Sequence, residues 1–129
     1  MSRQLVSSGS YLEPVIGFSR AVRVGNIVVV GGTAPIKAEG GTACIGDIYG
    51  QTRRCLEIIA KALADAGASL EDVTRTRIIV TDIALWKDAA RAHAEVFGVI
   101  RPVTTTMQVT AFVDPDWLVE IEAEAILER

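Results

Sequence analysis

The pattern of hydrophobic and polar positions begins with two short strands. Apolar and β-branched residues dominate 20–24 and 27–30, and the Gly25-Asn26 pair between them is typical of a tight hairpin turn. The second run shows no polar alternation, which predicts that it is covered on both faces. Gly31-Gly32 closes this strand, and a long loop is predicted to follow.

Two later segments have apolar residues at helical spacing. Between Asp47 and Ala66 the charged residues avoid one apolar stripe, and Gly67 follows as a left-handed stop. A second helix is predicted over about 85–97, with Asp82 as its cap. The inward stripe of this second helix is predicted to consist of Trp86, Ala89, Ala90, His93 and Phe97.

Three further strands are predicted at 73–81, 104–111 and 117–127. The order is therefore β-β-α-β-α-β-β, with room for a short extra strand near Leu5. This order predicts an α+β fold in which both helices pack on one face of a mixed sheet. The other face then needs a cover that so short a chain does not supply, which predicts self-association.

Composition and charge narrow the function classes. Half of the residues are hydrophobic and the mean hydropathy is +0.33, so a single domain over residues 1–129 is expected. The net charge of −3 argues against a nucleic-acid partner, which needs a clustered positive face. No apolar run approaches the ~18 residues of a membrane span, and no secretory pattern is visible. Cys44 and Cys55 are expected to be reduced thiols of a cytoplasmic protein without membrane contacts.

The last strand carries the most informative side chains. Alternation places Glu120, Glu122 and Glu124 on one face of it. Glu122 and Glu124 are interpreted as solvated, or as paired across the sheet with Arg75 and Arg77. Glu120 lies nearest the strand start, at the expected mouth of a cleft, and is the better candidate for a general base.

Other polar positions allow both a structural and a functional interpretation. The hydroxyls of Thr104 and Thr106 can orient a small polar ligand, although threonine is also an ordinary strand former. Gly31-Gly32-Thr33 offers backbone N–H groups for a carboxylate or phosphate, and equally forms a tight turn. His93 is interpreted as a core or interface residue, and Cys55 as packing. No histidine, cysteine or carboxylate spacing predicts a metal site.

Seven segments, found in order along the chain, resemble one known family. They are Ile16–Val22, Val29–Pro35, Gln51–Leu56, Ala66–Val73, Thr76–Asp82, Val96–Pro102 and Glu120–Ala123. Together they resemble the Rid family, also called YjgF-like or endoribonuclease L-PSP. The resemblance implies a chorismate-mutase-like fold and a barrel-like homotrimer with three clefts between subunits for a small-molecule metabolite. It also implies hydrolysis of reactive enamines and imines with no cofactor.

Position by position, the resemblance assigns places in the cleft to five residues, which lie around the first strands, on the second helix and in the last strand. The glutamate that handles water falls on Glu120, and a glycine that lines the substrate-carboxylate pocket falls on Gly32. A cleft aromatic, usually tyrosine, is Phe18 here. Gly31 stands in place of a serine, and Ala90 in place of an asparagine on the second helix.

The substrate-binding arginine of the family has no counterpart at its expected position. Thr104 stands there, and Thr106 replaces a nearby cysteine. Because threonine cannot make a bidentate, charge-assisted contact with a carboxylate, poor handling of short 2-imino acids is expected.

Three functions remain open. They are an imine or enamine deaminase with altered substrate preference, a non-catalytic trimeric metabolite-binding protein and, least favoured by the acidic charge, a ribonuclease or translation inhibitor.

Overall fold

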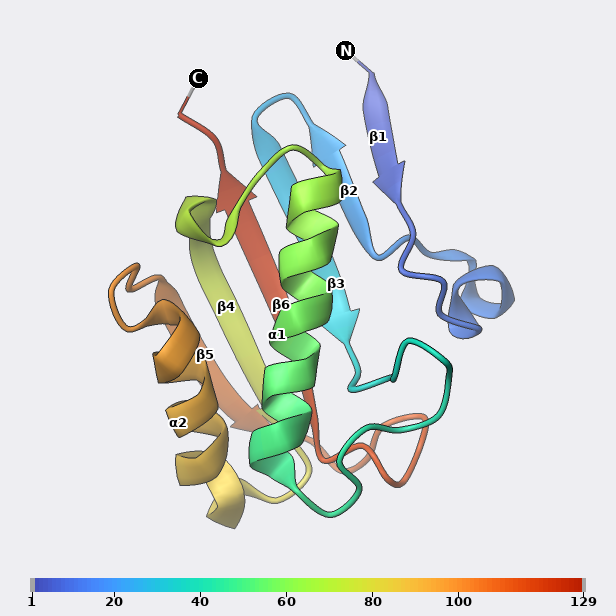
Figure 1. Cartoon of the computed structure of the whole chain (residues 1–129), viewed down its shortest axis with the longest axis vertical. Coiled ribbons are helices and arrows are strands. Elements are labelled where there is room, and N and C mark those ends of the chain that lie inside the picture. Colours follow the sequence, from blue (N-terminus) through green and yellow to red (C-terminus); the bar gives the residue numbers. More distant parts are fainter. Residues whose placement is uncertain (1, 129) are drawn as a thin grey trace.

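The computed structural model describes residues 2–128 (Figure 1). Its elements are β1 Arg3–Val6, β2 Ala21–Val24, β3 Ile27–Thr33, α1 Ile48–Asp65, β4 Val73–Val80, α2 Trp86–Phe97, β5 Val103–Gln108 and β6 Val119–Ile126. A π-helical turn at Glu13–Gly17 and 3-10 turns at Leu70–Asp72 and Ile83–Leu85 complete the set. The predicted order is confirmed, and the extra strand near Leu5 is β1.

The strands form one mixed sheet in the order β1-β2-β3-β6-β4-β5. The β4–β5 pair is parallel and the other neighbours are antiparallel. Both helices lie on the same face of the sheet, with α2 over the β4–β5 edge (Figure 1). The α+β fold and the placement of the two helices are therefore as predicted.

Local sequence explains where α1 begins and ends. The Asp47 side chain accepts a hydrogen bond from Gly50 N at 3.1 Å, which caps the first turn. Gly67 follows the helix with a φ of +83°, in the left-handed region that glycine occupies without strain.

The start of α2 differs from the prediction. Asp82 accepts a hydrogen bond from Ala84 N and so caps the 3-10 turn that precedes the helix. Trp86 then occupies the first helical position and is 47% exposed, so its predicted inward orientation is wrong. Ala89 and Phe97 are buried as predicted, because they lie farther along the face that packs on the sheet.

The core fills the space between the sheet and the helices. Val119, Ile121 and Ala123 of β6 are at most 1% exposed and belong to the same core as the inward side of α1. Cys55 lies there as predicted, and burial raises the pKa of its thiol. Within residues 2–128, no helix combines the length and hydropathy that a membrane span requires.

The opposite face of the sheet is open in the single chain. Val28 and Val30 are buried beneath the helices, whereas Ile27 and Val29 are 48% and 47% exposed. The predicted cover on both faces of this strand is therefore absent within one chain.

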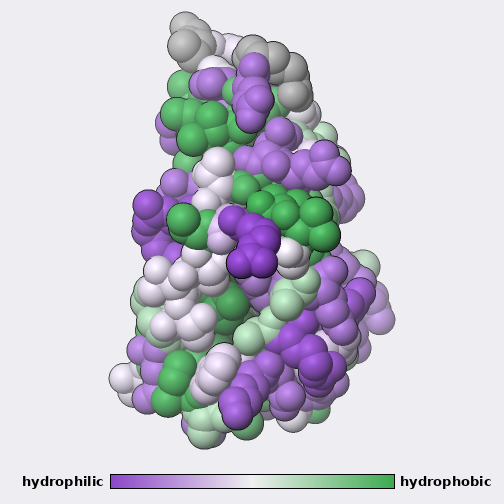
Figure 2. Space-filling view, turned by 90° about the vertical axis from the view of Figure 1, so that its left-hand side faces the viewer, coloured by the Kyte–Doolittle hydropathy of each residue, from purple (hydrophilic) through white to green (hydrophobic). Residues whose placement is uncertain are grey.

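The α2–β5 edge carries hydrophobic side chains scattered among hydrophilic ones (Figure 2), and Val103 on β5 is 65% exposed.

Candidate functional site

Glu120 lies on the open face of the sheet. Its neighbours Val119 and Ile121 point into the core, so alternation directs the half-buried Glu120 side chain the other way. A Cβ atom added to Gly32 would lie 2.8 Å from Glu120 Oε1. The β3–β6 register shifts between Val30 and Thr33, and this irregularity brings the Gly32 backbone against the carboxylate.

The environment of Glu120 favours its protonated form. Burial raises the pKa of this carboxyl above its usual value, the charge of Arg20 opposes that shift, and Glu122 adds to it. A carboxyl with a raised pKa is a stronger proton acceptor than an ordinary glutamate side chain, which suits it to accepting and returning a proton.

Arg20 fixes the backbone beside Glu120. Its Nη1 donates to Gly31 O at 3.3 Å, to Gly32 O at 2.6 Å and to Thr33 Oγ1 at 3.1 Å. The Phe18 ring centroid lies 5.1 Å from the guanidinium carbon. These five residues together with Glu120 are the Glu120 cluster.

Sequence reasoning missed Arg20, although the sequence held a signal for it. An arginine directly before the strand of a predicted hairpin faces the end of the paired strand, and here that end is the glycine pair. The Gly31-Gly32 pair does not close the strand as predicted but lies at the irregular end of β3, which runs to Thr33. Carbonyl groups at such an irregularity need donors when they are buried, and a guanidinium supplies several at once.

The predicted residues Thr104, Thr106 and Ala90 belong to a second group at the α2–β5 edge of the molecule. Thr104 Oγ1 lies 2.7 Å from Thr76 Oγ1, which in turn lies 2.8 Å from His93 Nε2. Thr106 follows Thr104 on the same face of β5. Ala90 precedes His93 by three positions, on the same side of α2. We call Ala90, Thr104 and Thr106 the Thr104 cluster.

His93 is a satisfied, half-buried residue of this region, as predicted. Its ring packs on Phe97 with centroids 4.8 Å apart, and burial lowers its pKa. The imidazole is therefore neutral at pH 7 and supplies no positive charge next to Thr104.

The two clusters are far apart within one chain. Thr104 pairs with Thr76 in β4, and Thr76 pairs with Ala123 in β6, three residues from Glu120. Thr104 is thus displaced from Glu120 by two strand spacings across the sheet and by three residues along the strand. These two displacements place their Cα atoms about 14 Å apart. Their side chains also point to opposite faces of the sheet. One small ligand cannot contact both within a single chain.

The remaining predicted carboxylates are structural. Glu122 forms an ion pair with Arg77 at 2.9 Å, and Glu124 lies opposite Arg75 in the ladder. The predicted cross-strand pairing is confirmed for Glu122. Among the residues from 2 to 128, no group of three or more histidine, cysteine, aspartate or glutamate side chains can hold a metal ion.

A six-stranded mixed sheet with two helices on one face defines a chorismate-mutase-like α+β protein. Residues 9–127 match the family model described as Endoribonuclease L-PSP. A crystal structure of Rv2704 from Mycobacterium tuberculosis, a member of the YjgF/YER057c/UK114 family, superposes with a TM-score of 0.88. It is 51% identical, and the match covers 98% of this chain and 100% of that one.

Two further relatives are similar over almost their whole length. The 3-aminoacrylate deaminase RutC of Acinetobacter baylyi is 34% identical over 125 residues, which cover 97% of this chain and 98% of RutC. A RutC family protein of Pyrococcus abyssi is 33% identical over 128 residues, with 99% and 100% covered. The chain therefore belongs to the Rid family. Membership supports a function that involves a small metabolite.

The raised pKa of Glu120 predicts a gain of stability on neutralisation. A carboxyl whose pKa is raised by folding stabilises the fold only at low pH, and this contribution is lost as the pH rises through the raised pKa. Glu120→Gln is therefore expected to unfold a few degrees above wild type at pH 7, with the difference disappearing below about pH 4. Thermal unfolding at both pH values measures this, with Glu124→Gln as the control on the same face. A lower melting temperature for Glu120→Gln at pH 7 would contradict it.

The contact between Gly32 and Glu120 predicts a specific effect of alanine. Gly32→Ala places a methyl group against Glu120 Oε1, so the flexible carboxylate moves and the fold survives. The resemblance assigns the handling of water to Glu120, and small misplacements of such a group are costly, so turnover in that role is expected to fall by about tenfold to a hundredfold. In Gly31→Ala the new Cβ lies 3.9 Å from the nearest atom, Arg20 O, so a much smaller loss is expected. Equal losses in steady-state assays of the two variants would argue against the contact.

Proposed function

We propose that this protein is a cofactor-independent deaminase of a small enamine or imine metabolite. The observation that carries the proposal is Glu120, a half-buried carboxyl with a raised pKa that lies against the Gly32 backbone. An ordinary solvated surface glutamate has neither feature. The similarity to RutC of Acinetobacter baylyi, named as a deaminase of the enamine 3-aminoacrylate, supports the same chemistry.

The reaction needs one group that removes a proton and returns it. Glu120 accepts a proton from water while the water oxygen bonds to the carbon of the protonated C=N group, and the nitrogen becomes a neutral amine. The protonated Glu120 then gives its proton to that nitrogen, which makes it a leaving group. As the C–N bond breaks and ammonia leaves, the Glu120 carboxylate takes the hydroxyl proton and the oxygen becomes the carbonyl oxygen of the product. Glu120 passes this proton to the next substrate: an imine receives it on nitrogen and an enamine on carbon, and both give the protonated C=N group.

The cleft of this proposal lies between subunits of a homotrimer. The open sheet face, with Ile27 and Val29 half exposed, supports association with further copies. The distance between the Glu120 and Thr104 clusters supports a shared cleft, because a ligand reaches both only if a second copy supplies one of them. Thr104 brings a hydroxyl already engaged with Thr76 and no cation. The preferred substrate is therefore expected to depend less on a carboxylate anchor than arginine-anchored substrates do.

Turnover tests this proposal directly. 3-Aminoacrylate, 2-iminopropanoate and 2-iminobutanoate are generated in situ, and ammonia release is followed with and without the purified protein. Acceleration above the uncatalysed rate for at least one substrate is expected, with the 2-imino acids as the poorer ones. An uncatalysed rate for all three would count against deaminase activity.

A non-catalytic binding role is the second candidate function. It is favoured by the contacts of Thr104 with Thr76 and of Thr76 with His93, which leave no positive charge beside Thr104. In that case amino or oxo acids raise the melting temperature while ammonia release stays at background. The ribonuclease activity in the family's description is the least favoured, because the chain carries a net charge of −3.

A further inference from the structure

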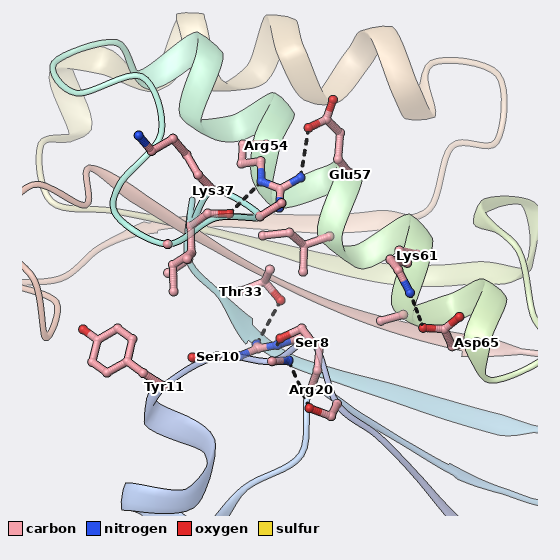
Figure 3. Close-up of a pocket in the computed structure, with 18 residues that line it drawn as sticks. Ser8, Ser10, Tyr11, Arg20, Thr33, Lys37, Arg54, Glu57, Lys61 and Asp65 are labelled. Atoms are coloured by element: carbon pink, nitrogen blue, oxygen red, sulfur yellow. Dashed lines mark hydrogen bonds and ion pairs between the residues drawn. The ribbon is translucent and has the colours of Figure 1, made fainter.

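A cavity of about 260 Å³ lies on the helix side of the molecule (Figure 3). Its walls come from the N-terminal segment 7–11, the end of β3 with the following loop, and one side of α1. Neither Glu120 nor Thr104 lines it. The cavity therefore shares Arg20 and Thr33 with the Glu120 cluster, but it contains neither the Glu120 carboxyl nor any residue of the Thr104 cluster.

Arg20 lies at the floor of this cavity and is only 4% exposed. Its Nε donates to Ser8 Oγ at 3.3 Å, and its Nη1 donates to residues 31–33 at the end of β3. Its Nη2 donates to none of the described residues 2–128. No carboxylate in that range lies within ion-pair distance of the guanidinium.

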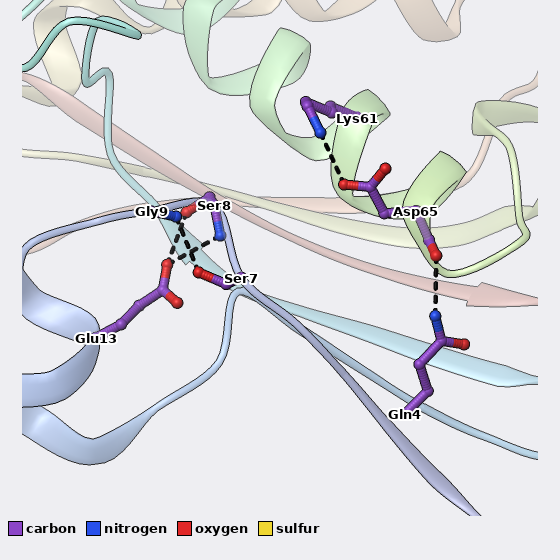
Figure 4. Close-up of polar contacts among 7 residues, drawn as sticks. All are labelled: Gln4, Ser7, Ser8, Gly9, Glu13, Lys61 and Asp65. Carbon is purple, nitrogen blue, oxygen red and sulfur yellow. Dashed lines mark hydrogen bonds and ion pairs between the residues drawn. The ribbon is translucent and has the colours of Figure 1, made fainter.

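The nearest compensation for this buried charge is indirect. Ser8 Oγ, which accepts from Arg20, donates to Glu13 Oε2 at 2.9 Å (Figure 4). A buried cation without a direct counter-ion is costly, and an anion at its free donor relieves that cost. Arg20 thus offers a binding position for a negatively charged group.

The acids that line the cavity are already paired. Glu57 lies 3.4 Å from Arg54, and Asp65 lies 2.9 Å from Lys61. Gln4 of β1 donates to Asp65 O at 2.9 Å and holds that end of α1 in place (Figure 4). A ligand carboxylate at Arg20 therefore meets no unpaired acid of the lining.

The other residues that line the cavity indicate what kind of chain the ligand carries behind its anionic group. Ala34, Ile58 and Ala62 give apolar walls, while Ser10 and Tyr11 add hydroxyls near the N-terminal segment. A dianionic phosphate needs several converging donors. Arg20 has one terminal nitrogen free, and Lys37, the other lining cation outside the ion pairs of residues 2–128, is an exposed side chain. A singly charged carboxylate with a short apolar chain fits this combination better.

We propose that this cavity is a second ligand site, which binds a short aliphatic monocarboxylate. The carboxylate accepts a hydrogen bond from Arg20 Nη2, and the chain packs against Ile58 and Ala62. The same guanidinium holds the carbonyl groups of Gly31 and Gly32 next to Glu120. Binding here is independent of the proposed deaminase reaction and goes beyond it.

Nuclear magnetic resonance titration of the intact protein with butanoate tests this site. Saturable shifts are expected at the amides of 8–11, 33–34 and 58–62, with a dissociation constant on the order of 1 mM. Arg20→Gln, which keeps donors but loses the charge, is expected to weaken binding about tenfold or more. Arg3→Gln on exposed β1 is the matched control and should bind as wild type does.

Three comparisons make the outcome decisive. Ile58→Trp fills the cavity and leaves Arg20 in place, so loss of binding in this variant supports the site even if Arg20→Gln fails to fold. Butylamine should not bind, and inorganic phosphate should bind more weakly than butanoate. The proposal is overturned if butanoate gives no saturable shifts at these amides, if Ile58→Trp binds like wild type, or if butylamine binds equally well.

Discussion

Glu120→Gln is expected to lower enamine hydrolysis by about 10²- to 10⁴-fold, the usual contribution of a general acid–base group. Glutamine keeps the size of the side chain and still fits against Gly32, but it cannot take a proton from water. The loss should appear in kcat, because the proton transfer belongs to the chemical step. Ammonia release under saturating substrate measures it.

The matched control for this variant is Glu124→Gln. Glu124 lies on the same strand and the same face as Glu120 but outside the Glu120 cluster. Its replacement is expected to leave kcat within about twofold of wild type. If both variants lose activity equally, the effect comes from the charge of the sheet face. If neither loses activity, Glu120 does not handle the water.

Val29→Lys is expected to abolish self-association and, with it, deaminase activity. Val29 is 47% exposed on the open sheet face and lies opposite Glu124, so a lone chain accommodates a lysine there. Burying the same ammonium between subunits costs several kcal/mol. Light scattering is expected to change from the mass of three chains to that of one, while circular dichroism keeps its α+β signature.

The comparison variant is Val113→Lys, an equal change at a position that is 67% exposed in the loop before β6. It is expected to keep the assembly and the activity of wild type. A Val29→Lys protein that still elutes as an oligomer with full activity would show that the open face is not the contact between subunits.

Much of the fold follows from local patterns. The Gly25-Asn26 hairpin, the Asp47 cap and the Gly67 stop depend on neighbouring residues alone, and all three appear in the structure. The alternation along β6 likewise predicts which side chains are buried, because period 2 separates the two faces of any strand.

Features that depend on contacts between distant strands could not be predicted from local sequence patterns. The bonds of Arg20 to the end of β3 join residues about a dozen positions apart, so they can be expected only once the two strands of the hairpin are considered together. The separation of Thr104 from Glu120 depends on strand order, since β6 lies between β3 and β4. The exposure of Trp86 depends on a 3-10 turn that delays the start of α2.

A shared cleft is most directly tested by combining two inactive variants in one assembly. Glu120→Gln removes the carboxyl to which we assign the proton transfer, and Thr104→Trp blocks the Thr104 cluster. In the proposed homotrimer, co-expression with two different tags and tandem purification isolates mixed trimers. Each mixed trimer contains one cleft with an intact Glu120 from one chain and an intact Thr104 from another, so about one third of wild-type ammonia release is expected. Mixed trimers as inactive as both parents would contradict a catalytic cleft built from two chains.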